Sequence, residues 1–295
     1  MSQNQPTTRQ RNDEAELDLL DFIYAQPNRD EIQGNPQKVL DLIDEFAKSR
    51  HLIHVGPEKG KVVADLIAVR KPQIMIELGG YVGYSAILFG DAVRRAGGKK
   101  YYSLEVNPEY AAISTLLLDL AGLRDFVQIL VGRSDQSLDK LYTSGEVPQV
   151  EIMFIDHYKP AYTTDLKLCE QLGMIVPDVS VLVADNVIYP GNPPYLEYVR
   201  STVEQKRKAA EKGPIQMYNT EGIPAATVRA FLGSDSTPLF DILGDPNLVY
   251  ESTLSQPEGL RVRCPRDYSV CRCREGVIGK SISGGRAFQS VGSEE

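Results

Sequence analysis

The chain has 295 residues, of which 42% are hydrophobic and 24% are charged, a composition that fits one globular domain with a full hydrophobic core. Its net charge of −8 and its isoelectric point near 5.1 disfavour nucleic acid and anionic membranes as partners. Residues 1–12 are polar and lack the apolar stretch of a secretion signal, no transmembrane run follows, and the four cysteines lack the CxxC spacing of a zinc site.

From these features we expect a cytoplasmic protein that is a monomer or weak dimer. Residues 1–30 are expected to form a flexible N-terminal segment, although residues 15–25 carry Leu17, Leu20 and Tyr24 at helical spacing. A second helix is predicted from Asn35, an N-cap residue followed by proline at the first helical position, and a third around residues 62–67. The folded domain is expected to span residues 31–265.

Strands and helices then alternate. Strands are predicted at residues 73–78, 101–106, 127–131, 152–156 and 180–184, and repeated βα units form a parallel, doubly wound sheet. Residues 248–253 and 260–264 are predicted to add an antiparallel hairpin, which completes a seven-stranded, Rossmann-like α/β sheet. Residues 213–246 have little regular pattern, residues 266–295 are expected to be a flexible tail, and Lys206-Arg207-Lys208 is expected on a solvated helix face.

The first predicted strand runs into Glu77-Leu78-Gly79-Gly80-Tyr81-Val82-Gly83. Glycines allow positive φ and close approach of a ligand, and the helix that follows offers unpaired N–H groups. Leu78 breaks the dinucleotide fingerprint G-x-G-x-x-G, and Glu77 would repel a phosphate, so an NAD(P) dehydrogenase is disfavoured. The stretch predicts a cationic or hydroxylated ligand, and a plain Gly-rich turn is the alternative.

Polar side chains stand at the predicted strand ends, where open α/β sheets bind their ligands. These residues are Glu77, Glu105, Ser134, Asp156, His157, Asp185 and Asn186. Glu105 ends the second strand, where a nucleotide-binding sheet places an acid for ribose hydroxyls. Its alternative role is to cap the next helix.

Asp156, Asp185 and Asn186 predict a site for a hard cation. Two carboxylates and one amide oxygen are ligands for Mg²⁺, and the two acids would repel each other without a cation. Lys159 follows Asp156 by three residues, and a nearby divalent cation disfavours the ammonium form, so this lysine could act as a general base. Loop-capping acids and a solvated lysine are the alternatives at this point.

Three stretches resemble the catechol O-methyltransferase family: residues 77–85, Phe154-Ile155-Asp156-His157-Tyr158-Lys159, and Leu182-Val183-Ala184-Asp185-Asn186-Val187. The similarity runs from about residue 34 to residue 200. It implies a Mg²⁺-dependent transfer of methyl from S-adenosylmethionine to one hydroxyl of a small-molecule catechol.

The resemblance also implies roles for single residues. The implied cofactor-binding residues are Val55, Glu77, Gly79, Tyr81, Ser85, Glu105, Val106, Ser134 and His157. The implied metal ligands are Asp156, Asp185 and Asn186, Lys159 is the implied base, and Pro190 is implied to lie beside the catechol ring.

The chain departs from the family pattern at the substrate. His51 and Tyr158 stand where the family commonly has tryptophan, and Asp135 replaces a glutamine. A late glutamate that bonds the second catechol hydroxyl has no secure match, with Glu251 and Glu258 as candidates. The alternatives are therefore a related methyltransferase acting on another vicinal diol or small molecule, and a non-catalytic S-adenosylmethionine-binding relative.

Overall fold

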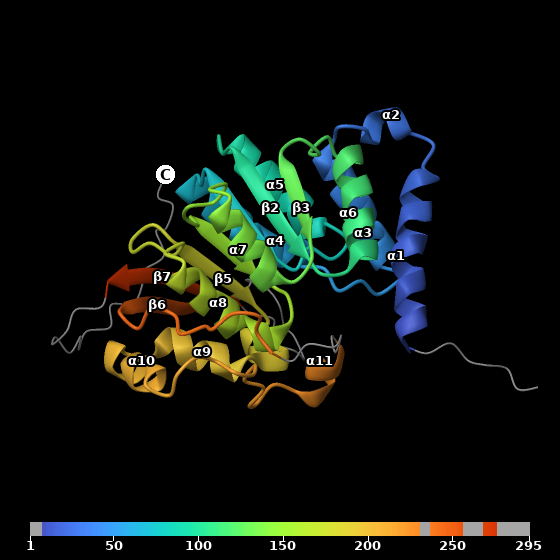
Figure 1. Cartoon of the computed structure of the whole chain (residues 1–295). Coiled ribbons are helices and arrows are strands. Elements are labelled where there is room, and N and C mark those ends of the chain that lie inside the picture. Colours follow the sequence, from blue (N-terminus) through green and yellow to red (C-terminus); the bar gives the residue numbers. More distant parts are fainter. Residues whose placement is uncertain (1–7, 231–236, 256–267, 276–295) are drawn as a thin grey trace, which may run out of the picture.

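A computed structural model describes residues 8–230, 237–255 and 268–275 of the chain. Its centre is one seven-stranded sheet with the order β3-β2-β1-β4-β5-β7-β6 (Figure 1). The parallel strands are β1 (Ile74–Leu78), β2 (Lys100–Glu105), β3 (Val127–Val131), β4 (Ile152–Ile155) and β5 (Val181–Asp185). The expected doubly wound α/β sheet is confirmed.

Helices cover both faces of this sheet, which is why its strands are almost continuously apolar. One face carries α3 (Pro36–Ala47), α4 (Gly56–Arg70), α5 (Tyr84–Arg95) and α6 (Pro108–Leu120). The other carries α7 (Ser134–Thr143), α8 (Tyr162–Gln171) and α9 (Pro193–Arg200). Successive strand residues point to opposite faces, so Met75 belongs to the first hydrophobic layer and Ile76 to the second.

The N-terminal helix belongs to the packed domain. Helix α1 (Thr8–Tyr24) lies beside α3 and α6 (Figure 1), and its Ala15, Leu19 and Ile23 are buried in the first layer. Leu17, one of the three residues at helical spacing, is 59% exposed. Helix α2 (Arg29–Ile32) also buries Ile32, so the expectation of a flexible segment is wrong for residues 15–30.

The C-terminal pair of strands is antiparallel, as expected, but its second strand is not where the sequence placed it. β6 (Leu248–Ser255) pairs with β7 (Tyr268–Glu275), and β7 lies between β5 and β6. The predicted strand at residues 260–264 lies outside the described residues. The expected tail is wrong for residues 268–275, because Cys271 and Cys273 are fully buried against the sheet.

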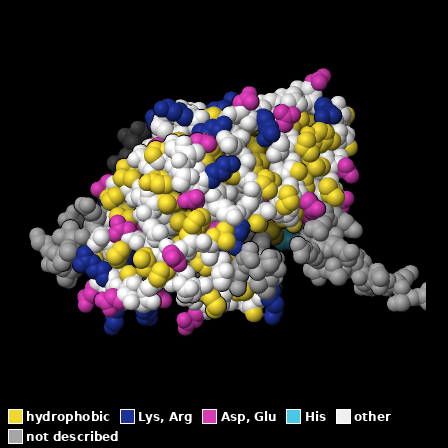
Figure 2. Space-filling model, in the orientation of Figure 1, with side chains coloured by type: hydrophobic (Ala, Val, Ile, Leu, Met, Phe, Trp, Pro, Cys, Tyr) yellow, Lys and Arg dark blue, Asp and Glu magenta, His cyan; other side chains and the backbone are white. Residues whose placement is uncertain are grey.

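The chain between α9 and β6 contributes two short helices, α10 (Val203–Ala210) and α11 (Ala225–Ala230). Lys206, expected in solvent, is buried instead, and its Nζ lies 3.5 Å from Glu170 Oε1 and donates to Leu248 O at 2.8 Å. Acidic and basic side chains alternate over the face shown in Figure 2, with no basic stripe among its described residues. None of the described helices is long and apolar enough to cross a membrane.

Candidate active site

The Gly-rich turn brings the ends of β1 and β4 together. Gly79 has a φ of +94°, and a Cβ there would lie 2.6 Å from Asp156 O, so the backbone crossing excludes a larger residue. Gly79 N donates to Leu104 O, and Asp156 N donates to Leu78 O. These contacts fix Asp156 beside the glycine turn.

Glu77 is a fully buried acid under this turn. A Cβ on Gly80 would lie 3.6 Å from Glu77 Oε1, and neither carboxyl oxygen of Glu77 makes a hydrogen bond to any described residue. Burial raises the pKa of Glu77 to about 7, while the hydroxyls of Ser103, Ser85 and Tyr101 act in the opposite direction. An acid with unused acceptors at a ligand turn can accept hydrogen bonds from a cationic group.

Glu105 holds the turn from the neighbouring strand. Its Oε2 accepts from Tyr81 N at 2.8 Å, and its Oε1 accepts from Asn107 N at 2.7 Å. Burial raises the pKa of Glu105, and these backbone N–H groups oppose that effect. Val106, the residue after Glu105, is 61% exposed.

Helix α1 reaches the same turn, which the sequence did not indicate. Tyr81 Oη donates to Glu16 Oε1, and the Tyr81 ring packs edge-on against Tyr110, with centroids 5.0 Å apart. Glu16 is 2% exposed although it is an acid. An acid inside the apolar pattern Ala15, Leu19, Ile23 was the available signal.

The other expected cofactor neighbours come from separate elements of the fold. Ser85 is buried on α5, Ser134 is the first residue of α7, and Val55 is buried just before α4. His157 Nε2 lies 2.8 Å from Asp165 Oδ2, and the His157 ring stacks on Tyr162 with centroids 5.0 Å apart. Asp165, which fixes this imidazole, was also missed.

The departure at Asp135 has a structural role. Its carboxylate is buried, receives two hydrogen bonds from Arg133 and accepts from Leu239 N at 3.1 Å. Arg133 in turn donates to Thr237 O at 2.8 Å and to Tyr218 Oη at 3.2 Å. Asp135 thus fastens the chain that follows α10 to the N-terminus of α7.

The three expected metal ligands gather at the ends of β4 and β5. Asn186 has a left-handed φ of 56°, and its N–H donates to Asp185 Oδ1 at 2.7 Å. Burial and then the charge of Asp156 raise the pKa of Asp185 to about 6, against the effect of Lys59 and Lys159. Two mutually repelling acids beside an amide oxygen fit a hard cation. Among the described residues, no group of three or more His, Cys, Asp or Glu side chains has an arrangement that could hold a metal ion.

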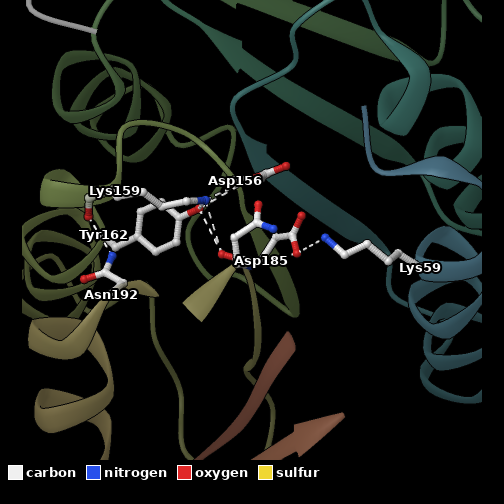
Figure 3. Close-up of polar contacts among 7 residues, drawn as sticks. Lys59, Asp156, Lys159, Tyr162, Asp185 and Asn192 are labelled. Carbon is white, nitrogen blue, oxygen red and sulfur yellow. Dashed lines mark hydrogen bonds and ion pairs between the residues drawn. The ribbon is translucent and has the colours of Figure 1, made fainter. Parts of the chain in front are cut away.

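Two buried lysines neutralise these acids (Figure 3). Lys159 Nζ donates to Asp156 Oδ1 at 3.0 Å, to Asp185 O at 3.2 Å and to Tyr162 Oη. Lys59, on α4, donates to Asp185 Oδ1 from the opposite side. Lys59 was missed, although it precedes the buried Val63 and Ile67 at intervals of four residues, which places it on the core face of its helix.

The loop after Asn186 is tied to the lysine. Pro190 lies in η2 (Val187–Gly191), and Asn192 Nδ2 donates to Lys159 O at 2.7 Å. Tyr158 packs edge-on against Tyr218, with centroids 5.9 Å apart.

The structure excludes Glu251 as the late glutamate of the family. Glu251 pairs with Arg272 of β7, and Arg272 pairs with Val181, the first residue of β5. Glu251 therefore lies at the end of the sheet where β5 begins, whereas Asp185 lies where β5 ends. Glu258 lies outside the described residues.

Comparisons with known proteins identify relatives of this chain. The family model for O-methyltransferases matches residues 17–213. The catechol O-methyltransferases of Bos taurus and Mus musculus are 37% and 38% identical over 170 residues, which are 57% of this chain and 61% and 63% of those proteins. The human transmembrane O-methyltransferase is 31% identical over 58% of each chain. The matches thus span less than two thirds of these curated relatives.

Solved structures share the fold. The O-methyltransferase TomG of Streptomyces achromogenes, in complex with SAM, has a TM-score of 0.52 at 17% identity and covers 91% of this chain and 100% of its own. SAH-bound PaMTH1 of Podospora anserina has a TM-score of 0.51 at 17% identity, with 94% and 100% covered. Because the family model matches well over half of the sequence, the chain belongs to the O-methyltransferase family.

Proposed function

We propose that this protein is a Mg²⁺-dependent O-methyltransferase that moves a methyl group from S-adenosylmethionine to one hydroxyl of a catechol. The observation that carries the proposal is the position of Lys159. Its Nζ is buried between Asp156 and the backbone of Asp185, at the same sheet edge as the glycine turn. Proton acceptor, cation ligands and cofactor turn would then serve a single reaction.

For the cofactor, buried Glu77 would accept from the ammonium of the methionine portion, and Ser85 and the N-terminus of α5 would bind its carboxylate. Glu105 would accept from the ribose hydroxyls. Val106 offers the exposed apolar surface that an adenine ring would cover. Ser134 and His157 would flank that ring, and the bond to Asp165 keeps the imidazole in one orientation.

For the metal, Asp156, Asp185 and Asn186 would supply three oxygen ligands. When bound, Mg²⁺ lowers the pKa of a coordinated hydroxyl and orients the substrate.

Within this frame Lys159 would act as a neutral amine, its own proton lost to solvent when the divalent cation binds nearby, and would take the proton of the reacting hydroxyl on Nζ. As the O–CH₃ bond forms, the S–CH₃ bond would break and leave S-adenosylhomocysteine, the methyl ether and an ammonium on Lys159. Asn192 holds the Lys159 backbone, and Tyr162 Oη accepts from Nζ, so the base stays in place throughout the transfer. A positioned base of this kind is worth about 10²–10⁴-fold in rate.

The substrate is the less constrained part of the proposal. Pro190 and the exposed Tyr189, in the loop that Asn192 ties to Lys159, offer apolar surface for a flat ring. With tryptophan absent from the sequence, Tyr158 and His51 would take the ring-facing positions. A related vicinal diol is the second candidate.

The test is methyl transfer from labelled S-adenosylmethionine into a panel of catechols, aliphatic diols and monophenols, with and without Mg²⁺. We expect label only in catechols and only with the metal. Transfer that persists in EDTA would refute the metal role. Binding of S-adenosylmethionine without transfer to any acceptor would favour the non-catalytic relative.

A further inference from the structure

We propose that Lys59 is a positioning residue for Asp185, which holds one carboxylate oxygen so that the other is presented to the metal. This inference rests on the proposed function, because it concerns how the chain prepares its cation site. Lys59 lies 126 residues from Asp185 in the sequence and belongs to a different layer of the fold.

The two oxygens of Asp185 differ in their partners. Oδ1 accepts from Lys59 Nζ and from Asn186 N, so both of its lone pairs are used. No hydrogen bond to Asp185 Oδ2 occurs among the described residues. A rotation of the carboxylate would break two bonds, one of them with a charged donor. Oδ2 is therefore the oxygen left for a cation.

Lys59 and Asp185 are both buried, and the packing of α4 restrains Lys59. The side chains of Lys59 and Asp185 are 6% and 3% exposed. Lys59 begins the buried stripe of α4, and Val63 and Ile67 anchor that stripe in the first hydrophobic layer. A Cβ on the next residue, Gly60, would lie 2.3 Å from Leu88 Cδ2, so α4 packs closely on α5. The ammonium cannot leave Asp185 without a shift of this packing.

Each of the two acids in the site pairs with a different lysine. Lys159 pairs with Asp156 and Lys59 pairs with Asp185, so each acid has its own cation before any metal arrives. A buried acid without a partner is strongly disfavoured. Outer partners that orient a metal-binding carboxylate are worth about 10–100-fold in metal affinity. Lys59 has the geometry of such a partner.

Charge repulsion between Lys59 and the metal would have the opposite effect on metal affinity. If Lys59 only competed with the metal for Asp185, its removal would tighten metal binding. If it oriented Asp185, removal would weaken binding, because the carboxylate could then turn toward Asn186 or point Oδ1 at the cation. The direction of the change in metal affinity separates the two roles.

The experiment measures Mn²⁺ binding to the full chain by electron paramagnetic resonance of free Mn²⁺, without cofactor, together with metal-free thermal unfolding. For Lys59→Met we expect Mn²⁺ affinity about 10–100-fold lower and a lower metal-free melting temperature. Lys59→Arg keeps the charge, but its forked guanidinium would engage both oxygens of Asp185. We expect it to melt near the wild type and yet bind Mn²⁺ more weakly.

Lys61→Met is the matched control, since Lys61 is on the same helix in an exposed pair with Asp65. Wild-type or tighter Mn²⁺ affinity in either Lys59 variant would overturn the inference, whatever the melting temperature. If Lys59→Met does not fold, Lys59→Arg decides. A wild type that binds no Mn²⁺ would refute the metal dependence in the proposed function instead.

Discussion

Glu77→Gln should make the stability of the protein less dependent on pH. In the folded chain this acid is fully buried, and burial raises its pKa from an ordinary 4.5 to about 7. Between these pH values the unfolded chain has lost the proton while the folded chain keeps it. Stability contributed by the protonated group is therefore present below pH 4.5 and is lost as pH rises toward 7.

The magnitude follows from the two pKa values. One pKa unit is worth about 1.4 kcal/mol, so ionised Glu77 costs the folded state about 3 kcal/mol above pH 7. Glutamine is uncharged and similar in shape, so this cost should vanish in the variant. The amide of the variant does not titrate, so its own contacts with Ser103 and Tyr101 are the same at every pH and do not affect the slope.

Urea unfolding of wild type and Glu77→Gln from pH 5 to pH 8 measures the effect. The free energy of unfolding of the variant minus that of the wild type should rise by about 2–3 kcal/mol over this range and stay level above it. Glu211→Gln, at an exposed glutamate, is the control and should give a constant difference. Two parallel curves for wild type and Glu77→Gln would refute the reasoning.

Glu77→Gln should also weaken binding of the cofactor. If Glu77 accepts from the cofactor ammonium, the variant loses a charge-assisted bond worth about 1.5–3 kcal/mol, and calorimetry should show S-adenosylmethionine binding about 10–100-fold more weakly. Equal affinity would remove Glu77 from the cofactor site while leaving its effect on stability intact.

Three further predictions concern other parts of the site. Lys159→Ala should lower kcat by about 10²-fold or more and retain Mn²⁺ binding, and added alkali should restore part of the rate; full kcat at neutral pH would exclude it as the base. Glu105→Ala should weaken S-adenosylmethionine binding by about 1.5–3 kcal/mol, measured by calorimetry, because its carboxylate also holds Tyr81 N; unchanged affinity would contradict this. Truncation after residue 267 should abolish cooperative unfolding, because it removes β7 from between β5 and β6; a two-state transition in circular dichroism would show that β7 is dispensable.

Local patterns were enough to predict the parallel part of the fold. Five apolar runs, each followed by a helical pattern, could form only a wound sheet, and its geometry placed Glu77, Asp156 and Asp185 at one edge. β7 was missed because Arg272 and Arg274 alternate with Cys271 and Cys273. Near the end of the sequence, such a polar stretch is typical of a flexible tail. Only pairing with β5 and β6 makes it a strand.

Long-range pairs explain the remaining failures. The pairs are Lys59 with Asp185, Glu16 with Tyr81, and Lys206 with Glu170, and each joins residues far apart in the sequence. A charged residue in a helix has no sequence mark that distinguishes solvent from a buried partner, beyond its position on an apolar stripe. Lys59 and Glu16 both lie on an apolar stripe, but their partners Asp185 and Tyr81 could be identified only from the structure.

The charge balance of the site bears on the substrate. With Lys59 charged and Lys159 a neutral amine, a bound divalent cation would leave the two acids and Lys59 with one uncompensated positive charge in a largely buried place. An acceptor that readily becomes an anion relieves this excess, and a catechol hydroxyl does so far more readily than an aliphatic one because the ring delocalises the charge. The same excess favours loss of the substrate proton before methyl transfer. Aliphatic diols of equal size should therefore bind weakly and not react, whereas catechols made more acidic by electron-withdrawing substituents should bind more tightly as the anion.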